Sequence, residues 1–369
     1  MPSTVWFWNL RAKMHAPYAV RMKRLLKAAK VNEHLRPGDL VALKIHFGEA
    51  GTTGYLRPIW LAPVVEFLAK AGARPFLTDA STLYVGERGE AVSHALCAAR
   101  HGFDPLALNA PVLIADGLRG EHQVAIPVKG KRIKQAYIAG AVAEADALVS
   151  VNHVKAHELA GFGGALKNVG MGSASKQGKM HQHVTTGPKL ERAKCKGCGL
   201  CVTVCAPGAL ALAPDGLIEL EAGTCRGCGA CFLACRNGAL VIDWKTDMQE
   251  FQERMMEYAK AVLATKKRPS LHLNFVVDVV PDCDCIGFTD APICPDIGVL
   301  ASFDPVAVDQ ASVDLVNAAP PLYPSRLPAG VKPGQNKFRS FRPHIPEDMG
   351  LAYAEKIGLG SRKYTLKEV

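Results

Sequence analysis

The segment 146–153 reads DALVSVNH, an apolar run closed by polar residues that is typical of a buried strand. Upstream, 38–46 (GDLVALKIH) and 73–80 (ARPFLTDA) have the same character. Between them, 59–71 (IWLAPVVEFLAKA) has helical periodicity and ends at Gly72. Strands that alternate with helices are the pattern of a parallel sheet. We therefore expect an α/β domain built on a parallel sheet, with a further helix over 133–145.

Ionisable side chains close four of the apolar runs, namely His46, Asp79, Asp116 and His153. Ligands of open α/β sheets bind beyond the carboxyl ends of the strands, so this edge is predicted to be functional. Each residue alone is more often a cap or a satisfied polar group. The prediction therefore depends on four of them sharing one edge.

The strand that ends at His153 leads into a glycine-rich, cationic loop, 155–172 (KAHELAGFGGALKNVGMG). It matches neither a P-loop nor the G-x-G-x-x-G dinucleotide motif, because Leu166 stands where each motif needs a glycine. Its backbone amides could still hold an anion, and its lysines could pair with a phosphate or a carboxylate. The alternative is a structural loop with solvated lysines.

Two sets of site residues are predicted around this loop, for a small anionic substrate or an organic cofactor. The catalytic set is His46, His153, His157 and Lys167. The imidazoles of His153 and His157 could transfer protons or ligate a metal. The anion-binding set is Asp79, Lys155, Gly161, Gly163, Gly164 and Arg57, and Arg57 follows a second glycine-containing loop, 51–54 (GTTG).

Eight of the twelve cysteines form two copies of C-x2-C-x2-C-x3-C, at 195–205 and 225–235, and a similar apolar segment follows each copy. Three closely spaced cysteines suit three corners of a cubane, and the fourth reaches the other cluster. The expected ligands are Cys195, Cys198, Cys201 and Cys235 for one [4Fe–4S] cluster, and Cys225, Cys228, Cys231 and Cys205 for the second. The alternative is a pair of zinc sites, which seldom take four cysteines from one such short run.

Residues 188–245 resemble the bacterial two-cluster ferredoxins, and the resemblance is specific at the cysteines. One departure is that no proline directly follows the fourth cysteine of either copy. The resemblance implies an inserted α+β ferredoxin-like module. The expected organisation is 1–187 and 246–319 for the two parts of the α/β domain, 188–245 for the insertion, and 320–369 for a proline-rich basic arm.

Cys283 and Cys285 follow another predicted strand, 271–280 (LHLNFVVDVV). Cysteines two positions apart are poor candidates for an intramolecular disulfide, but they could ligate a further metal or take part in redox chemistry. The alternative is a pair of ordinary thiols.

The formal net charge is +10, and about +6 once the thiolates of two clusters are counted. Lysine and arginine are scattered, which argues against nucleic acid and favours a small anion or a soluble protein that donates or accepts electrons. No apolar run is long enough for a membrane helix, and 1–13 lacks the pattern of a signal peptide. We therefore expect a cytoplasmic protein without a membrane partner; a homo-oligomer stays open.

Several stretches together resemble the iron–sulfur protein family called domain of unknown function 362. They are 45–58 (IHFGEAGTTGYLRP), 76–84 (FLTDASTLY), 153–172 (HVKAHELAGFGGALKNVGMG), the double cysteine motif, and 283–317 (CDCIGFTDAPICPDIGVLASFDPVAVDQASVDLVN). The resemblance implies a ferredoxin module set in an α/β domain, and it brings no settled reaction.

The loop 157–167 (HELAGFGGALK) is also similar to a loop of the nickel-pincer lactate racemases, and 55–58 (YLRP) is similar to a second one. This similarity implies that His157 and Lys167 are site residues and that Arg57 holds an anion. It supports the location of the site and not racemase chemistry, since no iron–sulfur module belongs to that family.

These observations predict an iron–sulfur oxidoreductase whose clusters pass electrons to a site at the strand ends. Two alternatives stay open. One is a non-catalytic electron-transfer or docking protein. The other is a metal or cofactor assembly protein in which Cys283 and Cys285 hand on a metal.

Overall fold

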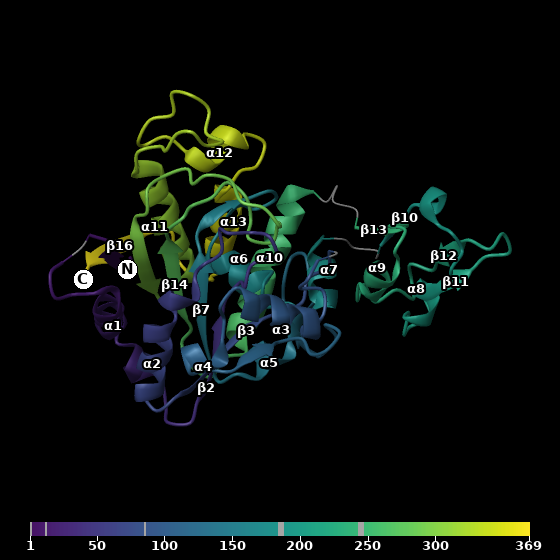
Figure 1. Cartoon of the computed structure of the whole chain (residues 1–369), viewed down its shortest axis with the longest axis horizontal. Helices are drawn as coiled ribbons and strands as arrows, with labels where there is room; N and C mark the ends of the chain where they lie inside the picture. Colours follow the sequence, from purple (N-terminus) through teal and green to yellow (C-terminus); the bar gives the residue numbers. More distant parts are fainter. Residues whose placement is uncertain (1, 12, 85, 184–187, 243–246) are drawn as a thin grey trace.

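The computed structural model describes residues 2–11, 13–84, 86–183, 188–242 and 247–369. Its centre is an eight-stranded sheet of order β16–β1–β15–β14–β7–β2–β3–β4 (Figure 1). The strands are β1 (Ser3–Asn9), β2 (Leu40–Lys44), β3 (Arg74–Asp79), β4 (Val112–Ile114), β7 (Ala147–His153), β14 (Leu271–Val276), β15 (Gly298–Ser302) and β16 (Tyr364–Glu368). β15 pairs antiparallel with both neighbours, whereas the other pairs are parallel. The predicted α/β class with a mostly parallel sheet is confirmed.

Helices cover both faces of the sheet. Successive residues of each strand point to opposite faces, and both faces carry apolar side chains that the helices bury. Val41 and Val149 face one apolar core, whereas their neighbours Ala42 and Leu148 face the other. The first core contains α1 (Tyr18–Ala28), α2 (Ala62–Lys70), α3 (Ala91–Arg100) and α4 (Pro105–Leu108). The second contains α6 (Ala165–Gly170), α10 (Met248–Ala264), α11 (Pro305–Ala318), α12 (Lys337–Phe341) and α13 (Asp348–Lys356).

Shorter elements lie around this framework. They are η1 (Val31–His34), η2 (Pro58–Trp60), α5 (Gly140–Glu144), α7 (Lys176–His183), and the hairpins β5 (Gln123–Pro127) with β6 (Gln135–Ala139) and β8 (Lys155–His157) with β9 (Gly161–Gly163). None of the described helices combines the length and the apolar character that crossing a membrane requires.

Two segments differ from the sequence prediction. The helix expected over 133–145 is half strand: β6 pairs with β5, and only the short α5 follows it. The arm expected over 320–369 includes α12, α13 and β16, and β16 pairs with β1 at the edge of the sheet. In both cases a partner strand outside the segment supplies the hydrogen bonds that make it a strand, β5 for β6 and the distant β1 for β16.

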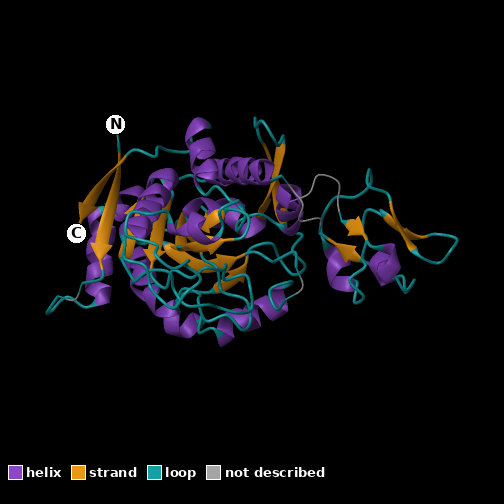
Figure 2. Ribbon diagram, turned by 90° about the horizontal axis from the view of Figure 1, so that it is seen from above, coloured by secondary structure: helices purple, strands orange, loops and turns teal. Residues whose placement is uncertain are grey.

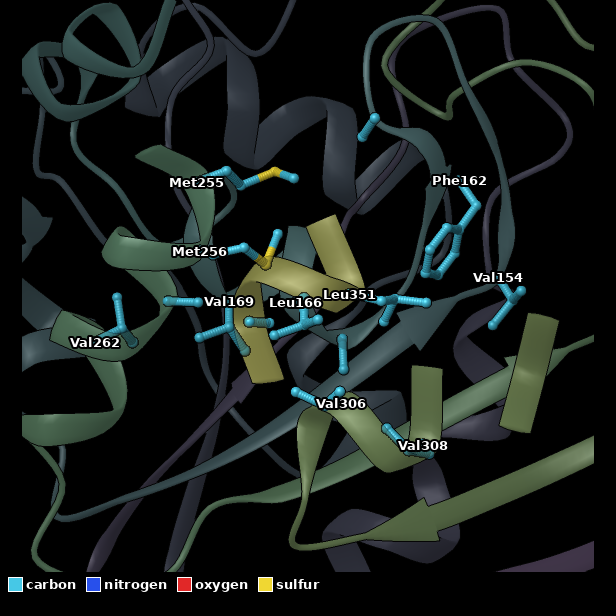
Figure 3. Close-up of a cluster of buried hydrophobic side chains, with 14 of the residues drawn as sticks. Val154, Phe162, Leu166, Val169, Met255, Met256, Val262, Val306, Val308 and Leu351 are labelled. Carbon is cyan, nitrogen blue, oxygen red and sulfur yellow. The ribbon is translucent and has the colours of Figure 1, made fainter. Parts of the chain in front are cut away.

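Helix α6 is held by apolar contacts on the second face of the sheet. Leu166 and Val169 are buried and lie among side chains of α10 and α11, with Met255, Met256 and Val306 around them (Figure 3). Burying these two side chains orients the opposite side of the helix toward the strand ends. Lys167, between them in sequence, is on that side and lines the cavity described below.

Residues 188–242 form a smaller unit beside the larger one (Figure 2). Its elements are β10 (Lys189–Leu190), η3 (Arg192–Lys194), α8 (Leu200–Thr203), β11 (Leu210–Leu212), β12 (Ile218–Leu220), α9 (Ala230–Ala234) and β13 (Leu240–Val241). They make two small antiparallel sheets, β10 with β13 and β11 with β12. The unit has its own apolar core, to which Leu83 and Met180 of the larger unit also belong.

Candidate functional site

A cavity of about 350 Å³ opens at the carboxyl ends of β2, β3 and β7. It brings together most of the residues predicted from the sequence: His46, Asp79, His153, Lys155, His157, Gly163, Gly164 and Lys167. Three of the predicted residues do not line it. Arg57 is exposed ahead of η2, Gly161 lies against Glu347, and Asp116 is buried under Ser81.

Asp79 is committed to a buried network of charges. Lys44 Nζ lies 2.8 Å from one of its carboxylate oxygens, and Arg88 Nη1 lies 3.2 Å from the other. Burial alone would raise the pKa of Asp79, but the charge of Lys44 and its other partners hold it well below the usual value. Lys44 also donates to Asn168 Oδ1 at 2.8 Å, which ties β2 to α6. This geometry suits Asp79 to positioning the cavity wall rather than to contacting an anion.

Asp284, which is far away in the sequence, binds two of the predicted site residues. One of its oxygens lies 2.9 Å from His153 Nδ1, and the other accepts from Lys155 Nζ at 2.6 Å. Despite burial, the charges of His153 and Lys155 hold the pKa of Asp284 below its ordinary value. His153 Nε2 faces the carbonyls of Val277 and Asp278 at 3.1 and 3.0 Å. Both nitrogens of His153 therefore meet acceptors, and neither is free to exchange a proton with a ligand.

His46 differs from His153 because one of its nitrogens can face a ligand. The amide of Gly48 donates to Nδ1 at 3.0 Å, so in the neutral ring the proton is on Nε2. Burial and the charge of Arg88 hold the pKa of His46 well below its usual value. His46 thus lines the cavity as a neutral N–H donor.

Asp309 positions the helix that carries Lys167. Its two oxygens accept from the amides of Ala165 at 2.7 Å and Leu166 at 2.9 Å, at the first turn of α6. Burial raises the pKa of Asp309 to about 6. A Cβ on Gly164 would lie 2.3 Å from Asp309 Oδ1, so a glycine is required where the loop enters this helix.

Cys283 and Cys285 lie beside Lys167 and His157. Lys167 Nζ is 3.2 Å from Cys283 Sγ, and one ligand atom of His157 lies within 4.8 Å of both sulfurs. Hydrogen bonding to Cys285, opposed by burial and aided by the charge of Lys167, holds the pKa of Cys283 well below the usual thiol value. The same hydrogen bond and burial raise the pKa of Cys285 well above it. Cys285 also lines the cavity.

Several cavity residues were not predicted, among them Tyr84, Arg88, Glu158, Asn168 and Lys179. Lys179 is the most informative. Its ammonium group donates to the Ala174 carbonyl at 2.6 Å, and within the described part of the chain no carboxylate pairs with it. Burial lowers the pKa of Lys179 to about 8. No sequence motif marks Lys179, and the packing of α7 against α10 and β6 brings it into the cavity wall.

Replacing Lys179 by methionine should weaken the binding of small carboxylates about tenfold or more, because a buried charge-assisted hydrogen bond is lost. In the unchanged protein the affinity should fall as pH rises through about 8, where Lys179 loses its proton. Isothermal titration with 2-hydroxy acids and dicarboxylates at pH 7 and pH 9 measures both effects.

The matched control is Lys356→Met, which removes an exposed lysine at the end of α13. It should leave affinity and pH dependence unchanged. Equal affinities for the Lys179 variant and the unchanged protein would exclude this lysine from anion binding.

The eight motif cysteines of the smaller unit surround two separate hollows. Cys195, Cys198 and Cys201 of the first copy line one hollow together with Cys235 of the second copy. Cys225, Cys228 and Cys231 of the second copy line the other together with Cys205 of the first. Backbone amides point at the sulfurs, as from Gly227 to Cys225 at 3.4 Å and from Ala239 to Cys235 at 3.2 Å. Within each copy two glycines have positive φ, for example Gly197 at 66° and Gly199 at 70°, which lets the loop turn around its hollow.

The second hollow is close to the cavity of the larger unit. Leu83 lines that cavity and also packs in the apolar core of the smaller unit. A Cβ on Gly229, in the loop of the second hollow, would lie 3.1 Å from Leu83 Cδ2. One side chain therefore connects the two sites.

Fold and site define a protein of the α/β class with a strand-end cavity and an adjoining cysteine-rich unit. Residues 41–314 match the family described as a domain of unknown function (DUF362), and the chain belongs to this family. No functionally curated protein matches the sequence.

Two solved structures are distantly similar. A crystal structure of a Thermotoga maritima protein is 10% identical, with a TM-score of 0.42 over 81% of this chain and 58% of that one. The lactate racemase apoprotein of Thermoanaerobacterium thermosaccharolyticum is 13% identical, with a TM-score of 0.35 over 74% of this chain and 51% of that one. The chain thus spans little more than half the length of either, and neither superposition is close enough to transfer a function.

Proposed function

We propose that this protein is an iron–sulfur oxidoreductase. The eight motif cysteines would hold two [4Fe–4S] clusters, and the strand-end cavity would bind a small anionic substrate or organic cofactor. The observation that carries the proposal is the exchange of the fourth cysteine between the two hollows, as expected of a two-cluster ferredoxin-like module.

The spacing of the sulfurs supports clusters over zinc. Four thiolates on one zinc ion lie about 3.8 Å apart, since each Zn–S bond is about 2.3 Å. Among the described residues, the motif cysteines form no group of three or more whose ligand atoms come within 4.8 Å of one another. A cubane is larger than a single ion and needs its cysteines further apart. The amides directed at Cys225 and Cys235 suit the sulfurs of a cluster as well.

Bound clusters would transfer electrons one at a time. The protein's own contribution is to bring them near the substrate, and the packing of Leu83 against both sites supports such proximity.

Inside the cavity, the residues are suited to binding a small anion. Lys179 offers an ammonium group without a paired carboxylate within the described residues, and Lys167 lines the same cavity. His46 offers a neutral N–H donor. A carboxylate or phosphate held by the lysines could accept a hydrogen bond from the Nε2–H group of His46.

Protein purified without oxygen should contain about eight irons and eight acid-labile sulfides per chain, and its reduced form should show cluster signals in EPR. The matched control is Cys97→Ala, which removes a buried thiol outside both motifs and should change neither count. Stoichiometric zinc without sulfide would overturn the proposal. A full complement of clusters in a cavity that binds no small anion would favour an electron-transfer or docking protein.

A further inference from the structure

A tight turn brings the sulfurs of Cys283 and Cys285 together. The amide of Ile286 donates to the Cys283 carbonyl at 2.9 Å, so the two cysteines are the first and third residues of the turn. Their sulfurs approach within 4.8 Å. Asp284, between them, is fixed by His153 and Lys155, so the turn is rigid. The tertiary structure therefore permits a disulfide between Cys283 and Cys285, which their separation of two positions in the sequence argued against.

The surroundings of Cys283 Sγ are hydrogen-bond donors. Lys167 Nζ lies at 3.2 Å and the amide of Cys285 at 3.4 Å. The amides of Leu159 and Ala160 both donate to His157 Nδ1 at 3.1 Å, so the proton of the neutral ring is on Nε2. The ring of His157 therefore meets Cys283 as a donor and not as a lone pair.

These donors favour a thiolate over a metal ion. A metal would need a lone pair from His157, which the tautomer denies. It would also place two positive charges beside the ammonium group of Lys167. A thiolate at Cys283 instead satisfies all of these groups at once.

The two sulfurs have different access. Cys283 is 1% exposed, whereas Cys285 is half-buried and lines the cavity. In a disulfide between them, a reductant in the cavity would attack Cys285, and Cys283 would leave as the stabilised thiolate.

We propose that Cys283 and Cys285 form a redox-active dithiol that holds an electron pair at the wall of the cavity. On oxidation the S–H bond of Cys285 breaks, an S–S bond to Cys283 forms, one proton leaves to water in the cavity, and two electrons are released. This inference rests on the proposed function for the acceptors of those electrons, the two [4Fe–4S] clusters, one electron each. Reduction reverses each of these changes, and the pair thereby links one-electron carriers to a two-electron reaction.

A thiol–disulfide titration under exclusion of oxygen tests the proposal on the full-length protein. Samples are equilibrated with mixtures of reduced and oxidised dithiothreitol, quenched in acid, alkylated and analysed by peptide mass spectrometry. We expect Cys283 and Cys285 to lose their labels together in one two-electron transition. Cys97 and Cys294, both buried and free, should stay reduced and serve as internal controls.

The pH dependence of this equilibrium shows whether Cys283 is a thiolate in the reduced pair. If reduction leaves Cys283 ionised, only one of the two protons of dithiothreitol is taken up. The apparent equilibrium constant should then rise tenfold per pH unit between pH 6 and 8. The charged and titratable groups facing the pair are Lys167, His157, Glu158, Tyr84 and Arg88. Lys167→Met should remove the slope, and Lys167→Arg should restore it.

Independent alkylation of the two thiols at every ratio would overturn the dithiol, as would a stoichiometric third metal that Cys283→Ser removes. Iron and sulfide are counted on the same samples. A dithiol transition in protein without clusters would refute the proposed function and retain the dithiol. Eight irons with two permanently free thiols would refute the dithiol and retain the proposed function.

Discussion

Cys205→Ala combined with Cys228→Ala should leave about four irons per chain, although the two substitutions fall in different motif copies. Both cysteines line the same hollow, and they are proposed to ligate the same cluster. The double variant should therefore lose one cluster and keep the other. Iron and sulfide counts, with the EPR spectrum of the reduced protein, measure this outcome.

The matched control is Cys205→Ala combined with Cys201→Ala, which are four positions apart in one motif copy but line different hollows. This variant should lose both clusters and retain almost no iron. If each motif copy held its own cluster, the results for the two variants would be exchanged. The comparison thus decides the ligand sets without reference to any enzymatic activity.

Asp284→Asn should lower the free energy of unfolding by about 3–5 kcal/mol at neutral pH. The amide keeps the size of the side chain but removes the charge opposite Lys155, which would stay buried without a partner at the start of β8. His153 would lose its carboxylate partner at the same time. The shift of the denaturation midpoint, followed by tryptophan fluorescence without oxygen, measures the loss.

The sign of the pH dependence follows from the depressed pKa of Asp284. Its stabilising contribution is complete above the ordinary pKa of an aspartate, about 3.9, and is lost as pH falls through the lower folded-state value. The asparagine variant should lack this contribution at every pH.

Asp290→Asn is the control for this prediction. Asp290 is in the same loop but exposed, and it pairs with Arg326 at 3.3 Å. Its replacement should cost no more than about 1 kcal/mol. Equal losses in the two variants would contradict the assignment of a buried, structural ion pair to Asp284.

Much of the fold can be predicted from the sequence because it depends on local patterns. Apolar runs such as those ending at His46 and His153 have the length and composition of buried strands wherever they fold. β16 and the β5–β6 hairpin were not predicted, because their residues alternate weakly and become strands only through their partners. α7, which carries Lys179, was not predicted for a similar reason: its sequence is polar, and its burial comes from contacts with α10 and β6.

The sequence by itself determined the α/β class and predicted both the candidate site at the strand ends and the two cysteine sets proposed to ligate clusters. These follow from periodicity and from spacing within short segments. The tertiary structure alone decided which site residues are free to act. Asp79, His153 and Lys155 are held in ion pairs. Lys155 is 129 positions away in the sequence from its partner Asp284. The tertiary structure also set Lys167 against Cys283, 116 positions away. Electrostatic pairing depends on distance in space, which local sequence patterns do not contain.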